Sequence, residues 1–233
     1  MKKHIFIFTA LLISNLSFAQ KKSKKDYLVT LKTNFGIMHL VLFDDTPLHK
    51  ANFVKLVNQK FYDSLMFHRI IDGFMIQGGD PGSKNDKAGD KLGGGGGDLA
   101  RIPFEFKPNH VHKKGALAAA RDGNPEKKSS ACQFYIVQGK KLTDEEVTVA
   151  AQRNSMDYTT QQRAEYMILG GTPRLDNGYT VFGEAIDNLE LIDIIAKQPK
   201  DSADRPKVDI KMSMTVKKMR KKKITKRFGY KYL

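Results

Sequence analysis

The sequence contains a single cysteine, Cys132, and no tryptophan among its 233 residues. With one cysteine no internal disulfide can form, so packing must stabilise the fold. Cys132 begins the apolar stretch CQFYIV and has no obvious base nearby, and we expect it to be a small buried residue rather than a nucleophile. Beyond residue 18, no apolar run approaches the ~20 residues that a membrane-spanning helix needs, so we expect no transmembrane segment in the mature chain.

The N-terminus has the three parts of a secretory signal peptide. Two lysines precede an apolar run over residues 5–18, and the small residues Ser17 and Ala19 form a spaced cleavage site. We expect cleavage after Ala19, which would remove residues 1–19 and leave a periplasmic or secreted protein. A membrane anchor or a buried N-terminal helix is the alternative. No cysteine directly follows the site, which argues against a lipid anchor.

Acidic residues are absent from the end of the chain. Residues 217–233 contain nine Lys or Arg and no Asp or Glu, and the formal net charge of the whole chain is +15. Removing the two leader lysines leaves 38 basic against 25 acidic residues, or +13. Such a tail can bind an anionic lipid or cell-wall polymer, although no specific nucleic acid is expected. The alternative is a solvated extension, and three aromatic residues in the tail also allow packing against the domain.

Length and composition predict one globular domain. A basic linker, residues 20–26, precedes an expected domain over residues 27–219, and residues 220–233 form the basic tail. Residues 142–172 are polar and begin with a capping box, so we expect a helical insertion there. The five consecutive glycines within residues 80–100 predict a flexible surface loop. We expect the protein to be a monomer.

Alternating and β-branched patterns predict a mainly β fold. Residues 27–43 alternate on either side of the turn TNFG, which predicts a hairpin. Thr46 as N-cap followed by Pro47 predicts the start of a helix. Many short strands with two helices far apart in sequence favour a closed antiparallel barrel with helical lids. The further strands are expected at residues 67–71, 74–76, 115–120, 132–137, 179–184 and 207–219, and the helices at residues 46–58 and 187–198.

Nothing in the sequence predicts metal or covalent catalysis. The stretch QGKKLT resembles the end of a phosphate-binding loop, but Phe134 stands where that pattern needs its first glycine. His110 and His112 lack an evident third ligand, and we expect an exposed pair of loop histidines rather than a metal site. Ser129 and Ser130 lack an elbow motif.

One segment, FHRIIDGFMIQGGDP at residues 67–81, has two polar side chains, Arg69 and Gln77, inside its apolar runs. The segment resembles the signature of the cyclophilin family of peptidyl-prolyl cis-trans isomerases. Three further segments resemble the family in the same order, so that the resemblance covers about residues 28–219. They are TPLHKANFVKLV at residues 46–57, GALAAARDGNPEKKSSACQFYIV at residues 115–137 and LDNGYTVFGE at residues 175–184.

The resemblance implies a closed eight-stranded antiparallel barrel capped by two helices, and it implies a set of site residues. Arg69 matches the catalytic arginine, and no cofactor is implied. The residues that match the proline pocket and the adjoining groove are Phe74, Met75, Gln77, Ala120, Arg121, Gln133, Tyr135, Leu175 and Tyr179.

Three positions depart from common members of the family, and these put cyclosporin sensitivity in doubt. Tyr179 stands where many members have His, Arg174 where some have Trp, and Tyr135 where Phe is common. His68 is expected to be structural, through hydrogen bonds to its neighbours.

The expected activity is isomerisation of Xaa–Pro bonds in proline-containing polypeptides during folding of exported proteins. Rotation about a peptide bond is opposed by a barrier of ~18–20 kcal/mol, because the nitrogen shares its lone pair with the carbonyl group. In the twisted state the lone pair is localised on the prolyl nitrogen, so a fixed donor such as Arg69 binds that state best. The alternative is a proline-peptide binding or chaperone module without catalysis. The insertion is either one bank of the substrate groove or a remote addition.

Overall fold

The computed structural model describes residues 23–86 and 90–232. The expected leader at residues 1–19 therefore lies outside the described residues. Within them, no helix is both long and apolar enough to cross a lipid bilayer.

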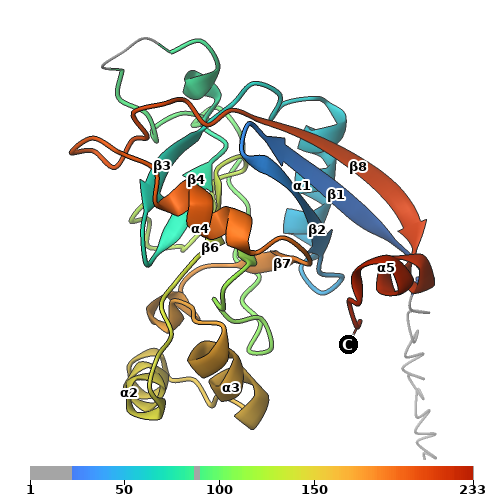
Figure 1. The fold of residues 1–233 in the computed structure, drawn as a ribbon, viewed down its shortest axis with the longest axis vertical. Helices are drawn as coiled ribbons and strands as arrows, with labels where there is room; N and C mark the ends of the chain where they lie inside the picture. Colours follow the sequence, from blue (N-terminus) through green and yellow to red (C-terminus); the bar gives the residue numbers. More distant parts are fainter. Residues whose placement is uncertain (1–22, 87–89, 233) are drawn as a thin grey trace, which may run out of the picture.

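One antiparallel sheet of eight strands dominates the structure (Figure 1). Its order is β3-β4-β6-β5-β7-β2-β1-β8. The mainly β, antiparallel prediction is confirmed. The strands are β1 (Lys25–Thr33), β2 (Gly36–Leu42), β3 (Phe67–Ile71), β4 (Met75–Gly78), β5 (Ala116–Ala119), β6 (Phe134–Val137), β7 (Val181–Ala185) and β8 (Met212–Arg220).

The prediction of a closed barrel is wrong, because the sheet is open and curled, with β3 and β8 as its two edges. β8 begins at Met212 rather than at residue 207. The two edges meet only near an isolated bridge between Met66 and Lys211. A loop that contains Pro206 lies along β3 instead, where the Ile70 N–H donates to the Asp204 carbonyl at 2.9 Å. Proline has no N–H to extend a ladder, so pairing along this edge stays local.

Helices α1 (Pro47–Asn58) and α4 (Glu190–Ala196) confirm the two predicted helices. Pro47 occupies the first turn of α1 as expected, but the side chain of Thr46 does not cap the helix. The carboxylate of Glu105 accepts from the backbone N–H groups of Leu48 and His49 instead, each at 3.0 Å. A negative group at this position satisfies free N–H groups and complements the helix dipole.

The insertion forms two helices, α2 (Asp144–Asn154) and α3 (Thr160–Ile168), as predicted. Each begins with a capping box, at Thr143 with Glu146 and at Thr159 with Gln162. Figure 1 shows both helices together below the sheet, away from its edge strands. There are also two short 3₁₀ helices among the described residues: η1 (Pro81–Lys84), after β4, and η2 (Pro173–Leu175), after the insertion.

The two faces of the sheet bury different apolar clusters. The larger cluster packs one face against α1 and α4 and includes Phe53, Phe134 and Ile192. Cys132 belongs to it and is buried, as expected for a core residue. The smaller cluster lies on the opposite face and includes Met75, Tyr135 and Leu175. Alternation along each strand separates the two sets, and the smaller one forms the candidate site.

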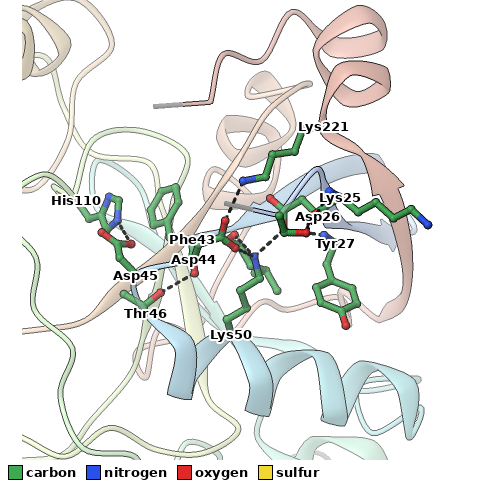
Figure 2. A network of polar contacts seen from close by, with 12 residues as sticks. Lys25, Asp26, Tyr27, Phe43, Asp44, Asp45, Thr46, Lys50, His110 and Lys221 are labelled. Carbon is green, nitrogen blue, oxygen red and sulfur yellow. Dashed lines mark hydrogen bonds and ion pairs between the residues drawn. The ribbon is translucent and has the colours of Figure 1, made fainter. Parts of the chain in front are cut away.

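The basic C-terminal segment is a docked helix, α5 (Lys221–Phe228). Its one fully buried side chain, Ile224, packs with Leu28 and Val41 at the end of the sheet. Asp44 joins the helix to α1, because its carboxylate pairs with Lys221 at 2.8 Å and with Lys50 at 2.7 Å (Figure 2). Packing, rather than a free solvated extension, therefore fixes this segment against the domain.

We expect Ile224→Ala to release α5 from the sheet. Truncating a fully buried isoleucine removes about 2–4 kcal/mol of stabilisation, which exceeds what surface ion pairs such as Lys221–Asp44 supply. Limited trypsin digestion should then cut at the lysines of α5 well before it cuts the sheet. The exposed neighbour Thr225→Ala is the control. Equal resistance to trypsin in the two variants would contradict the docking role of Ile224.

Candidate functional site

The site begins with a β-bulge that places Arg69 beside Gln77. Phe67 pairs with Gly78, whereas Arg69 pairs with Gln77, so the register shifts by one residue at His68. Without that shift Arg69 would pair with Ile76, whose side chain is in the main core. Because residues directly opposite each other share a face, the bulge places Arg69 and Gln77 on the same face.

The same row continues across the sheet. Gln77 lies opposite Tyr135 on β6, and Tyr135 lies opposite Ala118 on β5. Met75 is two residues from Gln77 and therefore shares its face. The structure thus brings Arg69, Gln77, Met75 and Tyr135 onto one face of the sheet.

A cluster of apolar side chains lies next to this row, at the residues that the resemblance assigns to the proline pocket. Met75, Tyr135 and Leu175 are buried in one cluster, and Phe74 and Tyr179 pack against it while remaining partly exposed. The Tyr135 and Tyr179 rings meet edge to face with their centroids 6.1 Å apart. Half-buried rings around buried apolar side chains can hold a small ring such as that of proline.

Two arginines stack on the exposed rings of the pocket. The Arg174 guanidinium carbon lies 4.4 Å from the centroid of Phe74, and that of Arg121 lies 4.6 Å from the centroid of Tyr179. Arg121 is also fixed by a 3.0 Å hydrogen bond from Nε to the Gly178 carbonyl. Arg174, which stands where some relatives have Trp, therefore covers the pocket with a cation.

Gln77 is positioned through the glycine-rich loop. Its Nε2 donates to Gln133 Oε1 at 3.2 Å, and Gln133 Nε2 donates to the carbonyls of Gly93 and Gly95, each at 2.9 Å. Asp80 accepts from the N–H groups of both glycines. A Cβ at Gly95 would lie 1.9 Å from Asp80 Oδ1, so only glycine fits there. These glycines therefore help to position Gln77. The glycine run in the sequence predicts only a flexible surface loop and does not indicate this role.

Tyr135 lies at the end of a buried hydrogen-bond chain that sequence reasoning missed. Its hydroxyl is 2.9 Å from His112 Nε2, and His112 Nδ1 is 2.6 Å from Asp176 Oδ1. Asp176 also accepts from the hydroxyls of Tyr158 and Tyr166 in the insertion. Burial raises the pKa of Tyr135 well above its usual value, so the phenol stays neutral. Hydrogen-bond partners far apart in sequence leave no pattern of spacing to detect.

The prediction of an exposed histidine pair is wrong. His112 is fully buried, and the side chain of His110 is only 7% exposed. His110 Nε2 lies 2.6 Å from Asp45 Oδ1, and its ring stacks on Phe43 (Figure 2). Each histidine has a carboxylate of its own, which compensates for its burial. Among residues 23–86 and 90–232, no group of acidic, histidine or cysteine side chains is arranged to hold a metal ion.

The insertion lies behind the pocket. Two of its buried residues, Val147 and Tyr166, pack on Val111 in a cluster of their own. Gln162 Nε2 donates to the Pro108 carbonyl at 2.7 Å. The insertion thus supports the segment that carries His112 and reaches the pocket through Asp176.

Arg69 also has a partner that the sequence did not indicate. Its Nε lies 3.5 Å from Asp204 Oδ2, and the two side chains are 42% and 28% exposed. Asp204 pairs in addition with Lys200 at 2.5 Å. Such an exposed pair contributes less than about 1 kcal/mol. Within the described part of the chain, no hydrogen bond engages the terminal nitrogens of Arg69, which leaves their N–H groups to donate to a substrate.

The expectation that His68 hydrogen-bonds its neighbours is wrong. Neither ring nitrogen has a hydrogen-bond partner among the described residues. Burial, together with the positive charge of Arg69, lowers the pKa of His68 to about 4, although Asp80 acts in the opposite direction. The imidazole is therefore neutral at physiological pH. His68 is the unpaired, buried residue of the bulge.

Comparisons with known proteins agree with this arrangement. The family model described as cyclophilin type peptidyl-prolyl cis-trans isomerase/CLD matches residues 28–217. A putative peptidyl-prolyl cis-trans isomerase of Staphylococcus aureus is 33% identical over 183 residues, which are 78% of this chain and 87% of that protein. A putative bifunctional phosphatase/peptidyl-prolyl cis-trans isomerase of Streptococcus pyogenes is 38% identical over 185 residues. That match covers 78% of this chain but only 37% of the longer protein.

Solved structures support the fold. The crystal structure of a cyclophilin type peptidyl-prolyl cis-trans isomerase from Cryptosporidium parvum aligns with a TM-score of 0.61 and 23% identity, over 83% of this chain and 98% of that one. A cyclophilin from Hirschia baltica aligns with a TM-score of 0.53 and 18% identity, over 82% of this chain and 76% of that one. With the family model matching most of the sequence, the chain belongs to the cyclophilin-type peptidyl-prolyl cis-trans isomerase family.

Proposed function

We propose that this chain accelerates cis–trans rotation of Xaa–Pro bonds at the face shared by Arg69, Gln77 and Tyr135. The observation that carries the proposal is the bulge at His68, which places a cation in register with Gln77 beside an apolar pocket. A planar donor aimed at the prolyl nitrogen binds the twisted imide better than either planar isomer.

The required effect is larger than one hydrogen bond can supply. A reduction of the barrier by roughly 6–8 kcal/mol would accelerate rotation by about 10⁴- to 10⁶-fold. A preorganised donor contributes roughly 3–4 kcal/mol of such an effect. The pocket around Met75, Tyr135 and Leu175 supplies the remainder by holding the proline ring while the flanking peptide turns.

The substrates that we propose are proline-containing segments of exported polypeptides. The N-terminal pattern of two lysines, an apolar run and the small-residue site before Gln20 supports export, to the periplasm or the medium. Uncatalysed Xaa–Pro isomerisation takes tens of seconds or more and can limit folding after translocation. A module that binds proline segments without catalysis is the alternative function.

A second candidate function is attachment to an anionic lipid surface through α5. Lys222, Lys223, Lys226 and Arg227 are all exposed, while Ile224 fixes the helix to the domain. Lysines beside an anionic bilayer each contribute about 1 kcal/mol of attraction. This end of the sheet is separated from β3 and β4 by the intervening strands, so attachment would leave the isomerase site accessible.

We expect Arg69→Ala to lower kcat/KM for a proline peptide by about 10²- to 10³-fold, because a donor specific to the twisted state is lost. Arg69→Lys should retain the charge but lose the planar fork, with an intermediate loss. Two-dimensional NMR exchange spectroscopy measures both rates. Arg153→Ala, an exposed arginine of α2, should match the wild type. Turnover of Arg69→Ala at the wild-type rate, with an intact fold, would remove Arg69 from the mechanism. Line broadening without faster exchange in the wild type would favour the binding module.

Stability should depend on pH through His68. Its pKa is lowered from 6.5 to about 4 in the folded chain, so the unfolded chain binds the proton more readily. The free energy of unfolding should therefore be highest above pH 6.5, where His68 is neutral in both states. It should decrease by about 3 kcal/mol as the pH falls toward 4. In denaturant titrations, the free energy of unfolding of the wild type minus that of His68→Gln should decrease by this amount between pH 6.5 and pH 4. A constant difference would contradict the assignment.

Vesicle sedimentation tests the lipid-surface candidate. The protein should bind phosphatidylglycerol vesicles and should not bind phosphatidylcholine vesicles. Binding to phosphatidylglycerol should fall steeply between about 0.05 and 0.5 M salt, because screening shortens the range of the attraction. Reversing Lys222, Lys223 and Lys226 to Glu should abolish it. The matched control reverses three exposed lysines elsewhere, Lys32, Lys55 and Lys60. Equal loss in both triple variants would show a nonspecific effect of net charge.

A further inference from the structure

The rim of the proline pocket carries two guanidinium groups that no carboxylate among residues 23–86 and 90–232 neutralises. Arg121 and Arg174 stack on Tyr179 and Phe74, and neither forms an ion pair with any described residue. The hydrogen bonds of Arg121 go to backbone carbonyls, those of Gly178 and Asp122. Stacking fixes the guanidinium plane while its N–H edges stay free to donate.

Both cations lie close to the cluster that contains Tyr135. The positive charges of Arg121 and Arg174 each act to lower the pKa of the Tyr135 phenol, against the larger opposite effect of burial. Tyr179 and Phe74, the rings on which they stack, both pack against the cluster that contains Tyr135. The two guanidinium groups therefore share one neighbourhood with Tyr135, although they come from segments more than 50 residues apart in sequence.

The acidic residues of this region are already engaged. Asp122 forms a bidentate pair with Arg101, and Asp176 is buried beneath four donors. Asp204 is shared by Lys200 and Arg69. Asp72 in the β3–β4 turn accepts from Gln138 Nε2 at 2.9 Å, a neutral donor, so unlike Asp122 and Asp204 it has no cationic partner in the described residues.

A further cation adds to this balance. The side chain of Lys140 lies across the backbone of Gly73, directly before Phe74, so closely that a Cβ at Gly73 would be 2.3 Å from its Cε. Lys140 is exposed, and it too forms no ion pair with a described residue. The groove around the proline pocket is thus positive, with donors that suit the planar geometry of a carboxylate.

We infer that the site selects proline segments carrying Asp or Glu within two residues of the proline, and that Arg121 and Arg174 are the residues that determine this specificity. The inference deepens the proposed function, on which it rests, by naming the chemical class of the substrate. A carboxylate that reaches either guanidinium gains a charge-assisted, bidentate contact, whereas a lysine in the same place is repelled. Arg174 contributes this contact where a tryptophan would offer only an apolar face.

The test compares peptides that differ only in charge. In the background acetyl-Ala-Ala-Ala-Pro-Ala-Ala-amide, Glu, Gln or Lys replaces each of the two alanines on either side of the proline. At one or more positions we expect kcat/KM for Glu to exceed that for Gln by about two- to fivefold, the range of an exposed ion pair, and Lys to fall below Gln. The ratio of Glu to Gln should approach one in about 1 M salt.

Substitutions assign the effect to particular residues. Arg174→Met and Arg121→Met retain an apolar side chain over the ring but remove the charge, and each should bring the Glu-to-Gln ratio to about one at the position that it governs. Arg153→Met changes the net charge equally and should preserve the ratio. A ratio of one at all four positions in the wild type, or an unchanged ratio in both groove variants, would overturn the inference.

Dissociation constants of the same peptides, from chemical-shift titration, separate this inference from the proposed function. If no peptide is isomerised faster, the proposed catalysis fails. The Glu-to-Gln ratio of the dissociation constants then decides the inference by itself: tighter binding of Glu supports it, and equal binding overturns it.

Discussion

The pocket depends on the hydrogen bonds that the buried carboxylate of Asp176 accepts. Its Oδ1 accepts from the backbone N–H of His112 at 2.8 Å and faces Nδ1 of the same residue, while Oδ2 accepts from two tyrosines of the insertion. A buried carboxylate with four donors is compensated for the water that it has lost. In the tautomer that carries the proton on Nδ1, facing the carboxylate, Nε2 is free to accept from the Tyr135 hydroxyl. Tyrosine can therefore replace phenylalanine in the pocket floor without bringing an unsatisfied polar atom into it.

This chain of contacts also explains why an insertion so distant from β3 and β4 belongs to the site. Tyr158 and Tyr166 reach Asp176, which directly follows Leu175 of the pocket and η2 with its Arg174. The insertion therefore supports the segment that carries one guanidinium group and one pocket residue. Polar networks of this kind are costly when broken, since each lost donor leaves part of a buried charge unpaired. The buried apolar residues of the insertion pack on Val111 and not on the pocket residues. The insertion therefore supports the pocket through Asp176, which is a different role from forming one wall of the substrate groove.

The sequence predicts those parts of the protein that rest on local patterns. The strands around FHRII and FMIQG, both capping helices and the capping box of Thr143 follow from alternation and from end signals that act within a few residues. The sheet edges, the partners of His110 and His112 and the pairing of Arg69 with Asp204 join residues far apart in sequence, which no local pattern encodes. The glycine run is instructive, because its composition indicates freedom, while contact with Asp80 makes glycine a steric requirement. The site residues themselves follow from the resemblance to a family, and the register at the bulge supplies the physical reason for their proximity.

The pairing of Arg69 with Asp204 is compatible with catalysis because it is weak. An arginine locked in a buried pair would have to lose several kcal/mol before it reached a prolyl nitrogen. Here both side chains are partly exposed, and the contact uses Nε at 3.5 Å, beyond hydrogen-bonding distance. The carboxylate is held from the other side by Lys200, so it limits the rotation of the guanidinium without neutralising it. A weak partner of this kind restricts the side-chain conformations of Arg69 before a substrate binds. Binding then costs less conformational entropy. The loop that contains Pro206 and lies along β3 thus matters for function, because the backbone that pairs with Ile70 also places Asp204 beside Arg69.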